Sequence, residues 1–248
     1  MTERISSAID EKGLHVLSSE AESRSIPVRE GYDRWAPIYD LAPNPVLALE
    51  ERYLKNMVPE LIGKNVLDLA CGTGRWIPRL LARGARRVIG IDLSAGMLRI
   101  AGAKAGIHGR LVVGNGSQLP FPPRAFDFVL CSFALNHMSN LDSVARELAY
   151  TLKEWGLLIL TEMHPKAYDE GWRPGFRDTR GAAQIETVRR SAERIVESFR
   201  ASGFGCLQEC DCFFGEPELS VFAAGGKSWF FKSACSVPAV KVWEFQKQ

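Results

Sequence analysis

Patterns of cysteine and histidine that would hold a metal are scarce in this 248-residue chain. Six cysteines are too few for a disulfide scaffold, and none belongs to a C-x2-C pair of the kind that structural zinc sites use. The nearest approach to a cluster is Cys206, Cys210 and Cys212. On a strand, their even spacing would put all three on one face. We therefore expect buried thiols and no metal site.

The chain also lacks an excess of charge, a long apolar run and an apolar leader. Lys and Arg number 31 against 29 Asp and Glu, and a net charge of +2 argues against electrostatic binding of nucleic acid. No apolar stretch approaches the roughly 20 residues that span a bilayer. Residues 1–11 contain acidic side chains and no apolar core. We expect no secretory signal, a cytoplasmic location, no membrane partner and a small-molecule partner.

An ordinary composition, with 46% hydrophobic and 24% charged residues, indicates a folded chain, and its length allows one large domain or two small ones. From Lys64 onward, short apolar segments alternate with segments of helical periodicity, which is typical of parallel strands covered on both faces. This alternation predicts one doubly wound α/β domain. The expected strands are 65–70, 87–92, 111–114, 126–131, 156–161, 204–214 and 237–245, and the expected helices are 75–83, 95–103 after an N-cap at Ser94, 140–153 and 187–202.

The remaining segments predict additions to this domain. Residues 1–60 form an N-terminal arm and helical lid in this interpretation, loose to about residue 28 with at most one short helix, and helical over 29–58 with proline breaks. Residues 61–248 form the α/β domain, in which the polar segment 163–186 is an insertion. A long loop that contains three aromatic residues at 229–231 is expected between the last two strands.

A glycine turn follows the first expected strand, with the sequence Asp-Leu-Ala-Cys-Gly-Thr-Gly from Asp68 to Gly74. Ligands of such sheets bind at the carboxyl ends of the strands, and glycines there permit close approach to the backbone. Asp92 ends the next strand, where a carboxylate can accept hydrogen bonds from both ribose hydroxyls of an adenosine. The alternatives are a simple tight turn and a capping aspartate. Together the two features indicate an adenosine ligand.

The glycine turn also bears on which adenosine ligand is bound. A dinucleotide fingerprint has a third glycine at the position of Ile77. Asp68 would repel a pyrophosphate, but a carboxylate suits a ligand that carries an ammonium group. S-adenosylmethionine has both an ammonium and a sulfonium, so these residues favour it over NAD. An NAD-dependent oxidoreductase stays as the alternative.

Five ordered segments resemble the motifs of class I S-adenosylmethionine-dependent methyltransferases. The resemblance runs from about residue 30 to 205 and is strongest for the ubiquinone/menaquinone-biosynthesis-like, type 11, small-molecule branch. Two positions depart from the family pattern: Asn115 stands where the family usually has Asp, and Trp155 where it usually has Pro. The similar segments are 66–74 (Val-Leu-Asp-Leu-Ala-Cys-Gly-Thr-Gly), 89–98, 114–121, 126–137 and 152–160.

The resemblance implies a seven-stranded, mostly parallel Rossmann-like sheet with an antiparallel last strand and a helical N-terminal cap. It also implies S-adenosylmethionine as cofactor and S-adenosylhomocysteine as product. Asp68 would anchor the methionine ammonium, Asp92 the ribose, and Asn115 with Gly116 the adenine. The further cofactor contacts that it implies are the backbone at Ala70, Gly72 and Gly74, then Leu93, Met97 and Ser117, then Cys131 and Phe133 near the methyl group, and Tyr32 and Tyr39 as a cover.

The implied reaction is an in-line SN2 displacement that transfers a methyl group to an O, N, C or S atom of a small molecule. Orientation supplies much of the acceleration, and a general base is needed only when the acceptor loses a proton. His137 and His164 follow strand ends, so they are candidates for catalysis and acceptor binding, with a packing role as the alternative for each. The other candidate acceptor contacts are Trp35, Trp172, Phe176 and Arg177, the last of which is otherwise a solvated arginine.

Two alternatives to a methyltransferase remain open from the sequence. One is the NAD-dependent oxidoreductase, and the other is a non-catalytic protein that binds S-adenosylmethionine. A monomer and a homodimer are both compatible with this chain.

Replacing Asp92 tests the predicted position of the cofactor. We expect Asp92→Ala to weaken S-adenosylhomocysteine binding at least about tenfold, because hydrogen bonds to a charged group are worth about 1.5–3 kcal/mol. Titration calorimetry measures the change. An unchanged dissociation constant would show that the cofactor is wrongly placed.

Overall fold

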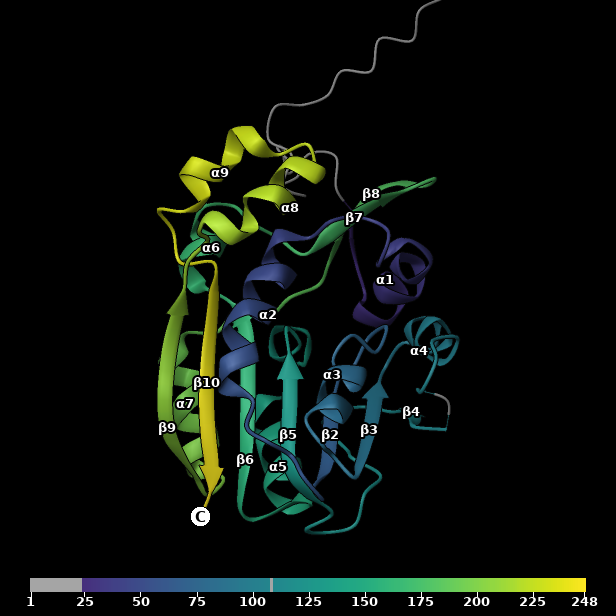
Figure 1. The fold of residues 1–248 in the computed structure, drawn as a ribbon, viewed down its shortest axis with the longest axis vertical. Coiled ribbons are helices and arrows are strands. Elements are labelled where there is room, and N and C mark those ends of the chain that lie inside the picture. Colours follow the sequence, from purple (N-terminus) through teal and green to yellow (C-terminus); the bar gives the residue numbers. More distant parts are fainter. Residues whose placement is uncertain (1–23, 108) are drawn as a thin grey trace, which may run out of the picture.

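A seven-stranded sheet forms the centre of the computed structural model, which describes residues 24–107 and 109–248 (Figure 1). Neighbouring strands are parallel except that β10 runs antiparallel to both β6 and β9. This confirms the predicted doubly wound α/β fold. In spatial order the strands are β4 (Leu111–Val113), β3 (Arg87–Asp92), β2 (Asn65–Leu69), β5 (Phe126–Ser132), β6 (Leu152–Met163), β10 (Val240–Lys247) and β9 (Phe204–Cys212).

Successive side chains of the strands face two apolar cores, one on each side of the sheet. Val66 of β2 belongs to one core and its neighbour Leu67 to the other. Figure 1 shows α2 in front of the sheet and α5 and α7 behind it. The first core takes side chains from α2 (Pro45–Met57), α3 (Ile77–Ala82) and α4 (Ala95–Gly102), and the second from α5 (Leu141–Thr151) and α7 (Ala192–Ala201).

The order of the strands creates a switch point between β2 and β5. From β2 the chain runs outward to β3 and β4, then crosses back to β5 on the other side of β2. Connections after β2 and β5 therefore diverge, which leaves a crevice at their carboxyl ends. Ala70 and Phe133 follow these two strands with φ of 55° and 51°, in the left-handed region that side chains rarely adopt. The backbone thus turns sharply at both strand ends.

Two segments far apart in the sequence form a small unit above the carboxyl ends of β2 and β3, which we call the cap. Its apolar core includes Ile26, Phe176 and Ile185. Arg34 adds an ion pair to Asp178 with an Nη2–Oδ1 distance of 3.0 Å. The elements of the cap are β1 (Arg24–Ile26), α1 (Val28–Trp35), η1 (Ala36–Ile38), β7 (Gly175–Asp178) and β8 (Gly181–Ile185), with β1 parallel and β7 antiparallel to β8.

Polar contacts hold the cap on the sheet domain. Asp33 Oδ1 accepts hydrogen bonds from Ser94 Oγ at 2.6 Å and from the backbone N–H of Gly96 at 2.8 Å. A Cβ added to Gly96 would lie 2.9 Å from this oxygen, so glycine permits the close approach. Ser94 is the predicted N-cap of α4 and accepts from the N–H of Met97. The cap therefore sits on the N-terminus of α4.

The cap corrects the expectation of a loose chain up to residue 28, because β1 pairs with β8 over residues 24–26. The same pairing orders the inserted segment 163–186, because β8 lies within that segment. The other expectations for the N-terminal arm, a short helix and the absence of a secretory signal, concern residues 1–23, which lie outside the described residues.

One expected loop and one helix boundary also differ from expectation. The expected loop before β10 contains η3 (Glu216–Glu218), α8 (Leu219–Ala224) and α9 (Ser228–Ala234). Phe230 and Phe231 drive this folding because they pack against the first core, whereas Trp229 is 53% exposed. The helix expected from residue 187 begins at Ala192, because Ser191 has an extended backbone and caps the helix by accepting from the N–H of Arg194.

The three cysteines of β9 do not share one face, contrary to expectation. Glu244 pairs with Gln208 and the next residue of β10 pairs with Cys206, so Leu207 is an extra residue at a β-bulge. The bulge reverses the alternation. Cys206 therefore packs with the second core, while Cys210 and Cys212 pack with the first.

None of the helices in residues 24–107 and 109–248 has the length and apolar character needed to cross a membrane.

Candidate active site

A cavity of about 690 Å³ lies beneath the cap at the carboxyl ends of β2, β3, β4 and β5. This is the crevice that the switch point creates, and its size suits a small-molecule ligand. The predicted cofactor residues that line it are Tyr32, Tyr39, Asp68, Ala70, Gly72, Asp92, Leu93, Met97, Asn115, Gly116, Ser117 and Phe133.

Two predicted cofactor residues are not among the described residues that line this cavity. Gly74 has φ +77°, and a Cβ there would lie 2.9 Å from Ile107 Cδ1, so this glycine serves the turn and the packing of the turn. Cys131 is fully buried in the second core, because the strand alternation turns its side chain away from the cavity.

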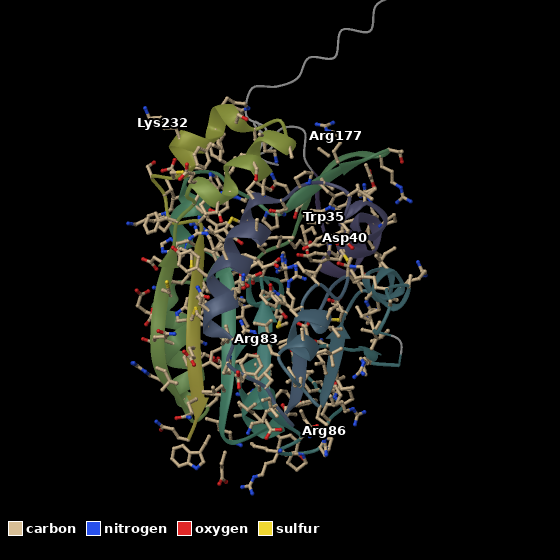
Figure 2. All side chains as sticks on the ribbon, viewed as in Figure 1. Trp35, Asp40, Arg83, Arg86, Arg177 and Lys232 are labelled. Atoms are coloured by element: carbon tan, nitrogen blue, oxygen red, sulfur yellow. The ribbon has the colours of Figure 1, made fainter. Side chains whose placement is uncertain are left out.

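The predicted acceptor residues fall into two groups. His137 lines the cavity, whereas the other five do not belong to its described lining. Trp35 and Phe176 stack on each other within the cap, with ring centroids 5.3 Å apart. Figure 2 shows Arg177 at the outer side of the cap hairpin, where it is exposed to solvent.

His164 and Trp172 have structural surroundings of their own. His164 Nδ1 accepts from the N–H of Lys166 and caps α6 (Pro165–Asp169), and its Nε2 lies 3.4 Å from Asp211 Oδ1. Trp172 is buried in the first core against Phe214 and Phe230.

Asp92 holds the glycine turn in place. Its Oδ2 accepts from the N–H of Gly72 and its Oδ1 from the N–H of Ser94, both at 2.8 Å. Burial raises the pKa of this carboxyl, while the two N–H groups oppose the shift. On the neighbouring strand, Asn115 Oδ1 accepts from the N–H of Ser117 at 2.9 Å and orders the next loop.

Asp68, on β2, is a buried carboxyl that faces the same cavity. Its exposed fraction is 2%, and it lines the cavity wall beside Asp92. Burial raises the pKa of Asp68 to about 8, Arg75 opposes this shift, and the charges of Asp92 and Glu50 add to it. A cation at this position would favour the ionised carboxylate.

Glu50 of α2 organises the floor of the site through a fully buried carboxylate. It pairs with Arg75 and accepts from Ser132 Oγ at 2.6 Å. The hydroxyl of Thr161 and the indole N–H of Trp76 also donate to it. Burial alone would lower the pKa of Arg75, but Glu50 outweighs that effect and keeps the guanidinium charged. Arg75 is thus fixed at the wall of the cavity.

Among the described residues, four buried polar side-chain atoms have no hydrogen-bond partner. Three of them belong to residues that line this cavity: Asp68 Oδ2, Arg75 Nη1 and Asn136 Oδ1. Buried polar groups are normally satisfied, so an unpartnered atom on a residue that lines a cavity is a candidate contact for a ligand group. The wall therefore offers an acid, a guanidinium and an amide oxygen.

His137 joins the cap to the sheet domain. It ends η2 (Leu135–His137), and its Nδ1 lies 2.9 Å from the carbonyl oxygen of Glu186. A carbonyl only accepts, so Nδ1 carries the proton and Nε2 accepts from the Tyr32 hydroxyl at 3.0 Å. Burial lowers the pKa of His137 and raises that of Tyr32. At neutral pH the imidazole is therefore an uncharged base.

The sequence reasoning missed Glu50, Arg75 and Asn136. Glu50 had a readable signal, because it lies within the apolar stripe of α2 formed by Val46 and Leu54 at helical spacing. A charged residue in such a stripe is rarely buried without a partner. The pairing of Asn136 depends on tertiary contacts and has no local signal.

The comparisons with known proteins concern the family of this chain and its fold. Residues 66–156 match the family model described as a methyltransferase domain. A demethylmenaquinone methyltransferase of Thermobifida fusca is 35% identical over 156 residues, covering 59% of this chain and 65% of the relative. The enzyme of the same name from Listeria welshimeri is 31% identical over 166 residues, covering 62% of this chain and 70% of the relative.

The chain belongs to the class I S-adenosylmethionine-dependent methyltransferases of the ubiquinone/menaquinone type. It spans slightly less than two thirds of the length of the T. fusca relative. The fold agrees with a solved S-adenosylmethionine-dependent methyltransferase from Mesorhizobium loti, with a TM-score of 0.66, 18% identity, and coverage of 82% of this chain and 100% of that chain.

The residues present fit the cofactor that gives this methyltransferase family its name. Its methionine part carries an ammonium and a carboxylate, and the cavity wall has an unpartnered carboxyl oxygen on Asp68 and an unpartnered guanidinium nitrogen on Arg75. Asp92, at the end of β3, stands where a ribose can be bound.

A test of the buried network compares two adjacent glutamates. We expect Glu50→Ala to lower the free energy of unfolding by about 3–5 kcal/mol, because it leaves the charge of Arg75 buried without its partner. Glu51 pairs with Arg79 with both side chains 40% exposed, so Glu51→Ala should cost less than about 1 kcal/mol. Urea unfolding measures both, and equal losses would contradict the assigned role of Glu50.

Proposed function

We propose that this protein transfers a methyl group from S-adenosylmethionine to a small-molecule acceptor. The observation that carries the proposal is the pair of unpartnered buried atoms, Asp68 Oδ2 and Arg75 Nη1, in the wall of one cavity. Together they complement the ammonium and carboxylate of an amino acid. Asp92, Leu93 and Met97 line the same cavity and supply the contacts for an adenosine.

The same wall disfavours a dinucleotide. A pyrophosphate would meet the carboxyl of Asp92, and it would keep Asp68 on the adjacent strand protonated, whereas an ammonium ionises Asp68 and pairs with it. The third glycine of the dinucleotide fingerprint is replaced by Ile77, which is fully buried in the first core. These two observations count against the oxidoreductase alternative.

The cofactor supplies a methyl group already activated on a sulfonium, so the protein needs to orient the reactants and exclude water. The cap and the turns after β2 and β5 contribute to both, because their residues line the cavity. For an acceptor that must lose a proton, we assign the base to His137, acting through Tyr32: the Tyr32 hydroxyl gives its proton to Nε2 and takes the proton of the acceptor. Tyr32 and the Glu186 carbonyl hold its ring, and its Nε2 is the unprotonated nitrogen.

The acceptor site in this proposal is the part of the cavity beside His137, between the cap and residues Glu186 to Val188. Demethylmenaquinone is the first acceptor to examine, because relatives of that name match this chain. We further infer a cytoplasmic monomer or homodimer without a nucleic-acid or membrane partner. The net charge of +2 supports the exclusion of nucleic acid.

Calorimetry separates the methyltransferase from the oxidoreductase. We expect S-adenosylhomocysteine to bind and NADH not to bind. Because the pKa of Asp68 is raised to about 8, its carboxyl is mostly protonated at pH 7, and an incoming ammonium expels that proton. Affinity should therefore rise by up to about tenfold per pH unit below pH 7, by about fivefold from pH 7 to 8, and then level off.

Asp68→Asn is the matched variant in this experiment. It should weaken binding and abolish both the proton release and the rise in affinity with pH. Binding of NADH in place of S-adenosylhomocysteine would overturn the proposed function.

The two predicted catalytic histidines give a second test. Incubation with methyl-labelled cofactor and a panel of small acceptors, beginning with demethylmenaquinone, measures transfer. His137→Gln should slow methylation of an O–H or N–H acceptor by about 10²–10⁴-fold, the usual contribution of a general base. His164→Asn preserves the helix cap and should leave the rate within about twofold.

An unchanged rate for His137→Gln would remove His137 as the base. Binding of S-adenosylhomocysteine without a methylated product from any acceptor would favour the non-catalytic alternative.

A further inference from the structure

Asn136, which lines the cavity, has one polar atom without a hydrogen-bond partner. Its backbone N–H donates to Glu162 Oε1 and its side-chain Nδ2 to Glu162 Oε2, both at 3.0 Å. Its carbonyl accepts from the N–H of Val188 at 2.7 Å. Oδ1 is the polar atom of Asn136 that has no partner among the described residues. Asn136 is only 4% exposed, and it lines the cavity.

Glu162 determines which atom of the Asn136 side-chain amide has no hydrogen-bond partner. A carboxylate only accepts hydrogen bonds, so the amide group that faces Glu162 must be the NH2. A flipped amide would bring two acceptor oxygens together. Burial raises the pKa of Glu162 to about 7, and the backbone N–H groups of residues 135, 136 and 163 oppose the shift. Above that pH the carboxylate holds Oδ1 as the free atom.

A buried amide oxygen without a partner costs free energy, which a donor from a ligand would recover. The cofactor has no need of this atom in the proposed arrangement, because Asp68 takes its ammonium and Asn115 and Gly116 take its adenine. Asn136 instead precedes His137 in η2, beside the cap and the backbone of Val188. The free oxygen therefore belongs to the acceptor side of the cavity.

We propose that Asn136 Oδ1 accepts a hydrogen bond from an O–H or N–H of the methyl acceptor, with Glu162 as the positioning residue that orients the amide. The acceptor class is thus a hydroxylated or amine-bearing small molecule, in preference to one that offers only carbonyl or ether oxygens. This inference rests on the proposed function, since it takes the cofactor as bound by the remaining residues.

The experiment uses matched probes that differ by one donor. Binding of 1-naphthol and 1-methoxynaphthalene, and of phenol and anisole, is measured by ligand-observed NMR on the complex with S-adenosylhomocysteine. We expect the donor-bearing member of each pair to bind about fivefold tighter, the value of an ordinary hydrogen bond. Absence of binding by both donor-bearing probes would overturn the inference.

Asn136→Leu provides the steric baseline for these ratios. It should lower each ratio at least about threefold while the affinity for S-adenosylhomocysteine stays within twofold. Unchanged ratios would overturn the inference. A loss of S-adenosylhomocysteine affinity above tenfold would assign Oδ1 to the cofactor, which overturns the inference and leaves the proposed function standing. Failure of the wild-type protein to bind S-adenosylhomocysteine would remove both.

Glu162→Gln gives a readout that a merely structural role would not produce. The new amide can donate to Asn136 Oδ1, which would turn Nδ2 toward the cavity, so the preference should reverse in favour of the methoxy probes. Tyr168→Phe is the control, because the Tyr168 hydroxyl lies 3.5 Å from Nδ2 and does not set the amide orientation. It should keep the wild-type ratios. If Asn136→Leu does not fold, Glu162→Gln alone tests the inference. A Glu162→Gln variant that still prefers the hydroxyl probes over the methoxy probes would overturn it.

Discussion

A single buried charge ties the layers of this protein to its cavity. The carboxylate of Glu50 enters the first core from α2, and removing such a charge from water is tolerated only when it is paired and fully hydrogen-bonded. Its partners come from the turn after β2, from the end of β5 and from β6. The helix, the sheet and the turn must keep their relative positions for this carboxylate to keep these partners. The walls of the cavity depend on that arrangement.

The electrostatic character of the cavity follows from where these charges are satisfied. Arg75 donates from Nη2 to Glu50, and its Nη1 has no hydrogen-bond partner. Asp68 and Asp92 lie at the ends of adjacent strands, and Asp92 is already engaged by two backbone N–H groups. A carboxyl and a guanidinium that each have an atom without a partner therefore stand at the same end of the sheet. A dipolar ligand suits this wall better than one of a single charge.

Much of the fold could be predicted from the sequence, because the strands of a parallel sheet and the glycine turn leave local patterns. Asp92 and Asp68 could be placed at the cavity from their positions at strand ends. The acceptor side of the cavity could not be predicted in this way. An aromatic residue such as Phe176 or Trp172 can line a pocket or fill a core, and in this structure both fill a core. Their burial depends on the pairing of β1 with β8 and on the helices before β10. A one-residue bulge likewise separated Cys206 from Cys210, and no local pattern signals it.

The pairing of the cap strands constrains the order in which the molecule can assemble. Ile26 lies opposite Ile185, after the chain has already supplied β2 to β6 and the helices between them. A ribosome delivers the partner of the first strand only after most of the sheet has emerged. Contacts between distant residues close long loops and form slowly. The cap that covers the cavity therefore forms late during synthesis, after the strands that build the cavity walls have been made.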